Sequence, residues 1–398
     1  MITSKVFSSK NVLILGMGVT GKSIAASLYK SGANIFYWDD NVIIKNKFRD
    51  SKYRIYKNKN FYWKKIDFLV VSPGIKTKGV NAHKIVKLAK KNECRIVSEI
   101  DLFQEYLEHC RYKNRIKVIA ITGTNGKSTV VTLINHILRR NKIPCSLVGN
   151  IGKSIFSSKE LKKGIYILEI SSFQLENSRL FAPDYACILN LGSDHMDRHK
   201  SLKRYANDKL RIFNNLSLNQ HGIINENHKE LKLGKRNLPE FIRKRIISVD
   251  FKKNYFLYFN HSKQALTKRK IVNSRILNPY LLGDHNRENI FFAIKISELL
   301  RIKHSRIVNA IKTFKGLEHR QEIVHSGSKV LIVNDSKATN FESLIPALKN
   351  YKNIYLICGG LPKNKNIEIL NKHINQLVMV FIIGLNQEPF FNYFNKRV

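Results

Sequence analysis

Cysteine and long apolar runs are both scarce in this chain of 398 residues. The five cysteines are widely spaced and include no C-x-x-C pair, which argues against a disulfide framework and a zinc site and favours a reducing, cytoplasmic location. The longest apolar stretch, residues 377–385, is much too short to span a membrane. Residues 1–10 lack the apolar core of a signal peptide. A membrane-spanning or secreted protein is therefore not expected.

Acidic residues are scarce as well, and this imbalance predicts attraction for anionic ligands. The chain has 29 Asp and Glu against 70 Lys and Arg, a formal net charge of +41. The basic residues are spread through every segment, without a basic tail or an aromatic-basic repeat, so dedicated nucleic-acid binding is not expected. Hydrophobic residues make up 43% of the sequence, and the length suits two or three folded domains.

The most informative motif is Thr-Gly-Thr-Asn-Gly-Lys-Ser-Thr at residues 122–129. An apolar run at 118–121 before it is typical of a strand, and the apolar spacing at 130–138 after it is typical of a helix. Backbone N–H groups and the helix N-terminus in such a turn attract phosphate, Lys127 adds positive charge, and Ser128 can hold a magnesium ion. The pattern predicts a site for nucleotide phosphates.

A second glycine-rich turn, Gly-Met-Gly-Val-Thr-Gly at 16–21, lies between predicted strands at 11–15 and 34–38. Asp39 and Asp40 follow the second strand, about twenty residues after the turn. This βαβ pattern taken alone predicts a dinucleotide cofactor, and it leaves an NAD-dependent dehydrogenase as one alternative.

Polar side chains also follow two predicted central strands. The strand at 166–170 carries Glu169 near its end, and the strand at 186–191 is followed by Gly-Ser-Asp-His at 192–195. Ligands gather at the C-terminal ends of strands in open α/β sheets, so these groups can converge on one crevice. A carboxylate there suits magnesium, and the position of His195 favours a metal or phosphate role.

The last part of the chain again alternates helix and strand. Residues 283–289 open a helix predicted at 290–300, and strands are predicted at 330–333, 354–358 and 378–383. The chain ends soon afterwards, so we expect an incomplete doubly wound domain here.

Six motifs in chain order give this sequence its resemblance to a known family. They are TGTNGKST (122–129), LEISSFQLE (168–176), DHMDRH (194–199), GDHNREN (283–289), GLEHR (316–320) and NDSKATN (334–340). With these motifs the chain resembles the Mur ligases of peptidoglycan synthesis over about residues 11–385. Within that family, Ser-Pro-Gly-Ile at 72–75 and the segment 335–340 resemble the branch that adds D-glutamate to UDP-N-acetylmuramoyl-L-alanine.

The resemblance implies an α/β ligase of three domains that uses ATP and forms an acyl phosphate on the muramoyl substrate. Residues 1–108 would be a Rossmann-like domain for the UDP-substrate, and 109–315 a central P-loop ATPase-like domain. Residues 316–398 would be a Rossmann-like domain for the amino acid, truncated at its end. The expected partners are UDP-N-acetylmuramoyl-L-alanine and D-glutamate, and a cytoplasmic monomer is expected.

The resemblance also implies roles for individual residues. The expected ATP contacts are Gly123, Thr124, Asn125, Gly126, Lys127, Ser128, Thr129, Asn286, Asn289, Arg320 and Asp335. The expected substrate contacts are Gly18, Val19, Thr20, Asp39, Asn150, Ser171, Lys337, Thr339 and Lys363. Two Mg²⁺ sites are expected, the first held by Ser128 and Glu169, the second by His195 and a carbamylated Lys209. Lys127, His195 and Lys209 would be the catalytic residues.

Two departures from the family pattern leave an alternative open. Glu318 stands where the family usually has proline. Residues 387–398 contain no serine and offer no counterpart of the loop that binds the side-chain carboxylate of D-glutamate in the family. The alternative is a catalytically impaired protein that still binds the UDP-muramoyl substrate and ATP.

Overall fold

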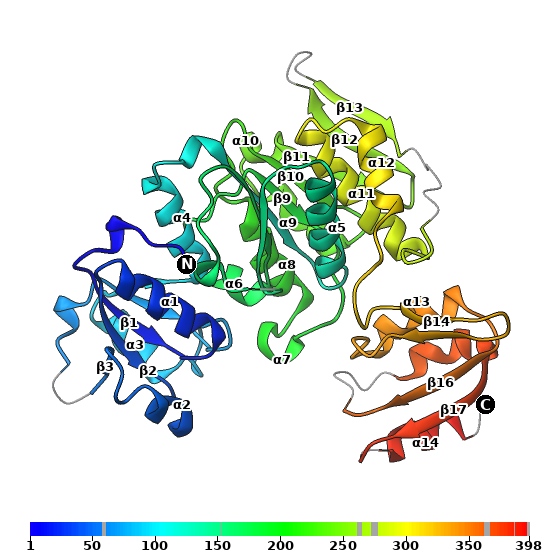
Figure 1. Cartoon of the computed structure of the whole chain (residues 1–398), viewed down its shortest axis with the longest axis horizontal. Coiled ribbons are helices and arrows are strands. Elements are labelled where there is room, and N and C mark those ends of the chain that lie inside the picture. Colours follow the sequence, from blue (N-terminus) through cyan, green and yellow to red (C-terminus); the bar gives the residue numbers. More distant parts are fainter. Residues whose placement is uncertain are drawn as a thin grey trace. The chain divides into compact units, whose positions relative to one another are not determined.

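A computed structural model describes residues 1–57, 61–151, 153–260, 265–271, 278–361, 367–385 and 387–395. The chain divides into two compact units, Met1–Asn273 and Ser274–Val398, and each has its own sheets and helices. Helices and strands alternate along both units (Figure 1), so the α/β class expected from the sequence is confirmed.

The N-terminal sheet of the first unit is parallel and has the strand order β3-β2-β1-β4-β5. Its strands are β1 (Asn11–Leu15), β2 (Asn34–Trp38), β3 (Arg54–Ile55), β4 (Phe68–Val71) and β5 (Arg95–Val97). The helices between and after them are α1 (Val19–Lys30), α2 (Val42–Lys47), α3 (Lys84–Lys91) and α4 (Glu99–His109). All four residues of β4 are buried, as expected for a parallel strand covered on both faces.

The central sheet of the first unit has the order β13-β12-β11-β10-β9-β6-β8-β7. Its strands are β6 (Ile116–Thr122), β7 (Cys145–Gly149), β8 (Gly164–Glu169), β9 (Tyr185–Ile188), β10 (His221–Asn225), β11 (Ile246–Asp250), β12 (Tyr255–Asn260) and β13 (Ala265–Lys270). The helices are α5 (Lys127–Arg140), α6 (Ser172–Glu176), α7 (Met196–His199), α8 (Leu202–Leu210), α9 (Lys229–Arg236) and α10 (Glu240–Arg243). Pairing is parallel from β7 to β11, and the last two strands are antiparallel.

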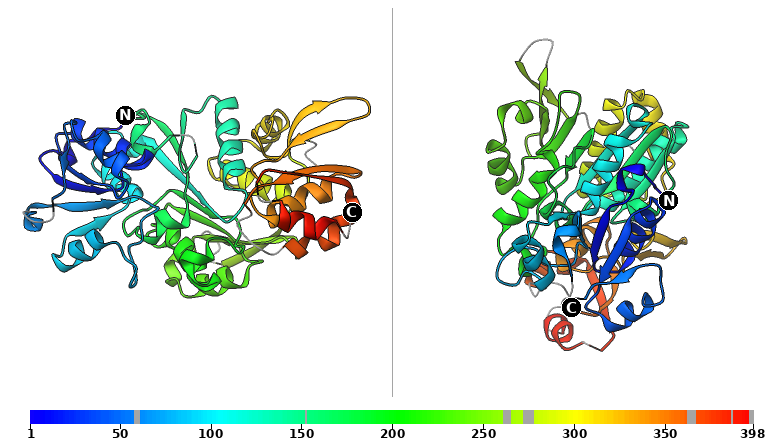
Figure 2. Two further views of the ribbon diagram at one scale, coloured as in Figure 1. Left: turned by 90° about the horizontal axis from the view of Figure 1, so that it is seen from below. Right: turned by 90° about the vertical axis from the view of Figure 1, so that its left-hand side faces the viewer.

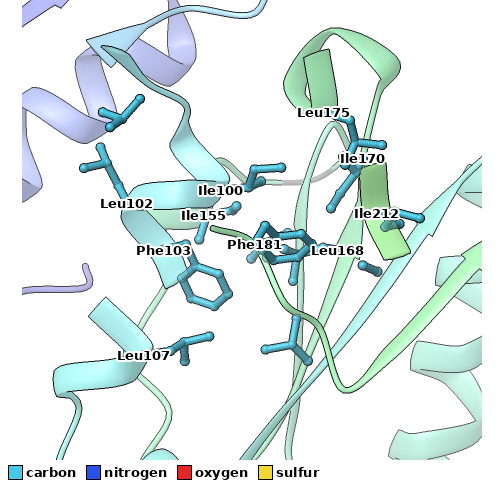
Figure 3. Packing of buried hydrophobic residues seen from close by; sticks show 14 of the residues in the cluster. Ile100, Leu102, Phe103, Leu107, Ile155, Leu168, Ile170, Leu175, Phe181 and Ile212 are labelled. Atoms are coloured by element: carbon cyan, nitrogen blue, oxygen red, sulfur yellow. The ribbon is translucent and has the colours of Figure 1, made fainter. Parts of the chain in front are cut away.

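One hydrophobic core joins the two sheets of the first unit, which lie side by side in Figure 2. Helix α4 supplies part of the link, because its buried side chains pack against residues of β8 and of the later central segments, such as Leu168 and Phe181 (Figure 3). The ring of Phe103 on α4 meets the ring of Tyr166 on β8 edge to face, with centroids 5.1 Å apart. Phe181 and Leu168 belong to the same cluster.

In its described residues the second unit contains four α-helices, one 3₁₀ segment and two short sheets. The helices are α11 (Asp284–Leu299), α12 (His304–Lys312), α13 (Phe341–Asn350) and α14 (Glu388–Phe394), and the 3₁₀ segment η7 spans Ile367–Gln376. An antiparallel pair is formed by β14 (Glu322–Ser326) and β15 (Leu331–Asn334), and a parallel pair by β16 (Ile354–Gly359) and β17 (Leu377–Ile383). The division into two units does not test the expected three-domain boundaries, which stay a prediction.

Most predicted elements are present in the described part of the chain. The strands predicted at 11–15 and 34–38 match β1 and β2 to the residue, and the helix predicted at 290–300 overlaps α11, which begins earlier and ends at Leu299. All five cysteines are free thiols. None of the described helices is long and apolar enough to cross a membrane.

Candidate active site

The turn between β6 and α5 has the backbone geometry that its glycines predict. Gly126 caps α5 in the left-handed region, at φ 82°, where other residues are strained. A Cβ on Gly123 would lie 3.0 Å from the Cβ of Leu189, so a larger residue would crowd the start of the turn. The turn therefore presents its N–H groups at the end of a buried strand.

Lys127 and Asn190 both stabilise this turn, Lys127 as a hydrogen-bond donor to its carbonyl groups and Asn190 as an acceptor from its N–H groups. The Nζ of Lys127 donates to the carbonyl oxygens of Gly123, at 2.9 Å, and Thr124, at 2.7 Å. The Oδ1 of Asn190 accepts the N–H groups of Thr124, at 3.0 Å, and Asn125, at 2.9 Å. The side chain of Asn190 thus occupies two of the N–H donors of the turn.

Three of the predicted site residues meet at the tip of β8. The Oγ of Ser128 donates to Glu169 Oε2 at 2.8 Å, and the Nδ2 of Asn150 donates to Glu169 Oε1 at 2.9 Å. Glu169 is 3% exposed. A carboxylate beside a hydroxyl at a phosphate-binding turn is a donor set that suits Mg²⁺, which usually takes one or two carboxylates and completes its shell with phosphates and water.

Few of the described carboxylates, thiolates or imidazoles are available to complete the coordination of an ion at Ser128 and Glu169. Among the residues that the structure describes, no group of three or more His, Cys, Asp or Glu side chains is placed to hold a metal. Mg²⁺ commonly keeps several water ligands and binds phosphate oxygens of a nucleotide in addition to one or two protein carboxylates.

Lys209 is 1% exposed, and its Nζ donates to the carbonyl oxygen of Gly123 at 2.9 Å. Burial and the nearby charge of Lys127 lower the pKa of Lys209 well below its ordinary value, while Asp194 and Asp208 act in the opposite direction. The Nζ also lies 4.3 Å from the ring centre of Tyr205. This environment favours the neutral amine, which is the nucleophilic form.

His195 sits at the N-cap of α7 in the left-handed region, with φ 55°. Its backbone N–H donates to Asp194 Oδ1 at 3.0 Å, and its ring centre lies 4.8 Å from that of Phe173. A strained backbone at this position is consistent with a functional constraint on the histidine.

His199, four residues later, is buried in a hydrogen-bonded chain. Its Nε2 pairs with Ser172 Oγ at 2.9 Å, and its Nδ1 pairs with Asp208 Oδ2 at 3.0 Å. This chain links the start of α6 to the residue before Lys209. The side chain of Ser171 caps α6, since its Oγ accepts the backbone N–H of Gln174 at 3.3 Å.

The glycine turn of the N-terminal sheet borders a cavity of about 310 Å³. The cavity is lined by Leu15, Gly16, Gly18, Val19, Thr20, Asp39, Asp40, Ser72 and Ile75. Asp39 Oδ2 accepts the N–H of Met17 at 2.6 Å, so this carboxylate fixes the turn. A Cβ on Gly21 would lie 1.9 Å from the carbonyl oxygen of Gly16, which only glycine avoids. Four of the predicted substrate residues therefore line one cavity.

The predicted residues of the second unit fall into two local groups. On α11, Asn289 Nδ2 donates to Asn286 Oδ1 at 3.1 Å, and both side chains are buried. Asp335 Oδ1 accepts the N–H of Gln321 at 3.1 Å, and burial raises the pKa of Asp335 to about 6 against the opposing effects of that hydrogen bond and of Arg320.

Two further predicted contacts follow Asp335 in the sequence. Lys337 Nζ donates to the carbonyl oxygen of Glu318 at 3.4 Å, and the N–H of Thr339 donates to the carbonyl oxygen of Lys337 at 3.0 Å. Lys363 lies outside the described residues.

Comparison with known proteins decides the family. The family model of the Mur ligase middle domain matches residues 121–297. The chain is 32% identical over 392 residues to the UDP-N-acetylmuramoylalanine–D-glutamate ligase of Rickettsia bellii, a match that covers 97% of this chain and 84% of that protein. The chain belongs to the Mur ligase family.

Other members agree with this assignment. The protein of the same name from Wolbachia pipientis is 32% identical over 447 residues, with 98% of this chain and 86% of that one covered. The crystal structure of the MurF ligase of Thermotoga maritima in complex with ADP has a TM-score of 0.55 at 13% identity, and covers 99% of this chain and 96% of that chain. At this identity the structural match supports the fold and no more than the fold.

The sequence analysis did not predict the role of Asn190 in the turn, nor the two hydrogen bonds of the buried His199. An asparagine just after a buried strand and before Gly192 is a usable signal, because the ends of β6 and β9 are adjacent in the sheet. For His199 the sequence held no such signal, since its partners Ser172 and Asp208 lie on different helices.

Proposed function

We propose that this Mur ligase joins D-glutamate to UDP-N-acetylmuramoyl-L-alanine, with conversion of ATP to ADP and inorganic phosphate, in the synthesis of peptidoglycan precursors. The observation that carries the proposal is the 32% identity, over 97% of the chain, to a protein that bears this name. The geometry of the phosphate-binding turn alone would fit many ATP-using enzymes.

In this proposal the turn between β6 and α5 binds the ATP phosphates. The N–H groups of residues 123–129 would cradle them, and Lys127 would exchange its two carbonyl partners for phosphate oxygens. Asn190 would have to release the N–H groups of Thr124 and Asn125, or share them. Further nucleotide contacts are assigned to Asn286, Asn289, Arg320 and Asp335.

Ser128 and Glu169 are the proposed ligands of a first Mg²⁺, with His195 and Lys209 at a second. A bound Mg²⁺ neutralises phosphate charge and stabilises the charge that develops during phosphoryl transfer. Lys209 would serve as a carbamate, formed when its amine attacks carbon dioxide and loses a proton. The depressed pKa and full burial of Lys209 support this chemistry, because only a neutral amine can attack.

The cavity at the first glycine turn is the proposed site of the UDP moiety, with Gly18, Val19, Thr20 and Asp39 in contact with it. Asn150 and Ser171 are proposed to contact the muramoyl part. Lys337, Thr339 and Lys363 are proposed to hold the incoming D-glutamate. The three-domain division, 1–108, 109–315 and 316–398, belongs to the same proposal, as does a monomeric state.

The reaction would take place in two steps. The carboxylate of the L-alanyl end attacks the γ-phosphorus of ATP, which forms an acyl phosphate and releases ADP. The neutral amine of D-glutamate then attacks the acyl carbon, the nitrogen loses a proton, and inorganic phosphate leaves with its bonding electrons as the amide forms. Lys127 and Arg320 would lower the repulsion among three anionic reactants.

The test is phosphate release from ATP and UDP-N-acetylmuramoyl-L-alanine, with and without D-glutamate. Stoichiometric amide formation that depends on all three compounds is expected. Binding of both nucleotides without D-glutamate-dependent turnover would favour the impaired binding protein, which the family match does not favour. Binding of NAD in preference to UDP would instead support the alternative of an NAD-dependent dehydrogenase.

A further inference from the structure

Arg198 joins two parts of the first unit that are far apart in the sequence. Its Nε and Nη2 donate to Glu176 Oε2 at 3.2 and 3.0 Å. Its Nη1 donates to the carbonyl oxygen of Gly74 at 2.9 Å, and its Nη2 also donates to that of Ile75 at 3.0 Å. One guanidinium therefore ties the end of α6 to the turn after β4.

This arrangement is largely shielded from solvent and specific. The side chains of Arg198 and Glu176 are 9% and 11% exposed. The guanidinium also lies 4.5 Å from the ring centre of Phe173, whose ring in turn lies 4.8 Å from that of His195. Only a planar fork of donors can reach a carboxylate and two carbonyl groups together, so lysine is not an equivalent.

The turn that Arg198 holds is a wall of the proposed UDP cavity. Ser72 and Ile75 line that cavity. Ser72 Oγ donates to the carbonyl oxygen of Gly16 at 2.8 Å, and the N–H of Ile75 donates to the carbonyl oxygen of Ser72 at 3.0 Å. A continuous set of contacts thus runs from the glycine turn through residues 72–75 to Arg198.

We infer that Arg198 is a positioning residue that fixes the Ser72–Ile75 wall and thereby sets the affinity for the nucleoside diphosphate of the substrate. Arg198 contacts the wall from outside and does not line the cavity. The inference rests on the proposed function, because it takes the cavity as the UDP site. The hydrogen bonds of Arg198 run to α6 and to the turn after β4 rather than to the phosphate-binding turn at 122–129, and it reaches His195 only through the ring of Phe173, so ATP affinity should change much less than UDP affinity.

The size of the effect is limited by neighbouring contacts. Thr77 Oγ1 pairs with Asn177 Oδ1 at 2.5 Å, and Lys78 Nζ donates to the carbonyl oxygen of Glu176 at 3.0 Å. These bonds keep the segment attached when Arg198 is removed. Loss of the two carbonyl contacts alone should weaken UDP binding by about tenfold, the effect of one to two net hydrogen bonds.

The experiment measures binding of UDP and of ATP by calorimetry in the full chain, with Arg198→Ala and Arg198→Lys. The matched control is Arg245→Ala. Arg245 is also buried, donates to the carbonyl oxygens of Ser217, at 2.7 Å, and Phe241, and lies 5.7 Å from the ring centre of Phe241. It therefore has similar structural contacts away from the cavity.

Arg198→Ala should weaken UDP binding about tenfold and leave ATP binding within about twofold. In steady state the KM for the UDP-substrate should rise while that for ATP does not. Arg245→Ala should lower the melting temperature and leave both affinities unchanged. Arg198→Lys should fall between wild type and Arg198→Ala, and it decides the question if the alanine variant does not fold.

Two outcomes overturn the inference alone: UDP affinity equal to wild type in Arg198→Lys and Arg198→Ala, or an equal loss of UDP and ATP affinity. A wild-type chain that binds ATP and not UDP would instead overturn the assignment of the cavity, and with it the proposed function.

Discussion

Glu169→Gln separates the structural role of Glu169 from its proposed role with Mg²⁺. The carboxylate accepts one hydrogen bond from Ser128 and one from Asn150. In the variant the amide oxygen can still accept from Asn150. The hydroxyl of Ser128 can reverse its direction and accept from the new NH₂ group, because a hydroxyl both donates and accepts. Both contacts therefore survive in neutral form.

The cost in stability should be small. A hydrogen bond to a charged group contributes about 1.5–3 kcal/mol and a neutral one about 0.5–1.5 kcal/mol, so two conversions lose roughly 2 kcal/mol. Removal of a buried charge recovers part of that loss. We expect a net destabilisation of about 1 kcal/mol, which is a fall of about 2–4 °C in melting temperature for a domain of this size.

The cost in activity should be large by comparison. A neutral amide is a poor ligand for a hard divalent cation, so the rate of amide formation at saturating substrates should fall on the order of a hundredfold or more. The assay is amide formation across a titration of MgCl₂, with Glu240→Gln as the control, since Glu240 lies on the surface in a pair with Lys244. Activity above about a tenth of wild type would refute the role in metal binding. A fall in melting temperature above about 8 °C would refute the expectation that both hydrogen bonds at position 169 are kept in the variant.

Three further variants test other parts of the site. Lys127→Ala should lower ATP turnover by about tenfold or more, because its ammonium supplies charge at the phosphates; phosphate release near the wild-type rate would contradict this. Lys209→Ala should be inactive and partly rescued by formate or acetate, whereas a fully active variant would make Lys209 a structural lysine only. Burial raises the pKa of Glu99, so between about pH 4.3 and that higher pKa the folded state keeps a proton that the unfolded state has lost. The free energy of unfolding should therefore fall as pH rises through this window. Denaturant titrations should find that Glu99→Gln makes the slope less steep, since Asp335 contributes to it as well, and an unchanged slope would assign it entirely to other groups.

The sequence predicted those elements whose apolar pattern is uninterrupted. β1 and β2 were recoverable to the residue because each is an apolar run bounded by a turn. β13 was not, because its lysines, its arginine and its exposed side chains leave no buried face. β3 has two residues, too few for any period to be visible.

The candidate site divides in the same way. The resemblance to the Mur ligases implied that Ser128 and Glu169 act together, and the structure brings them together because β6, which precedes Ser128, pairs with β8, which ends at Glu169. The hydrogen-bonded chain through His199 and the contacts of Arg198 could not. Their partners are set by how α6, α7 and α8 pack, and no sequence spacing encodes that packing.

The core shared by the two sheets of the first unit has a consequence for its cooperativity. The face of α4 that carries Phe103 is covered by side chains of the central sheet. A fragment that ends after α4 would expose this face to water, and the central sheet without α4 would lose the same cover. We therefore expect both sheets to melt in one calorimetric transition, with equal van't Hoff and calorimetric enthalpies over that transition. A protease cut between α4 and β6 should release no stably folded piece.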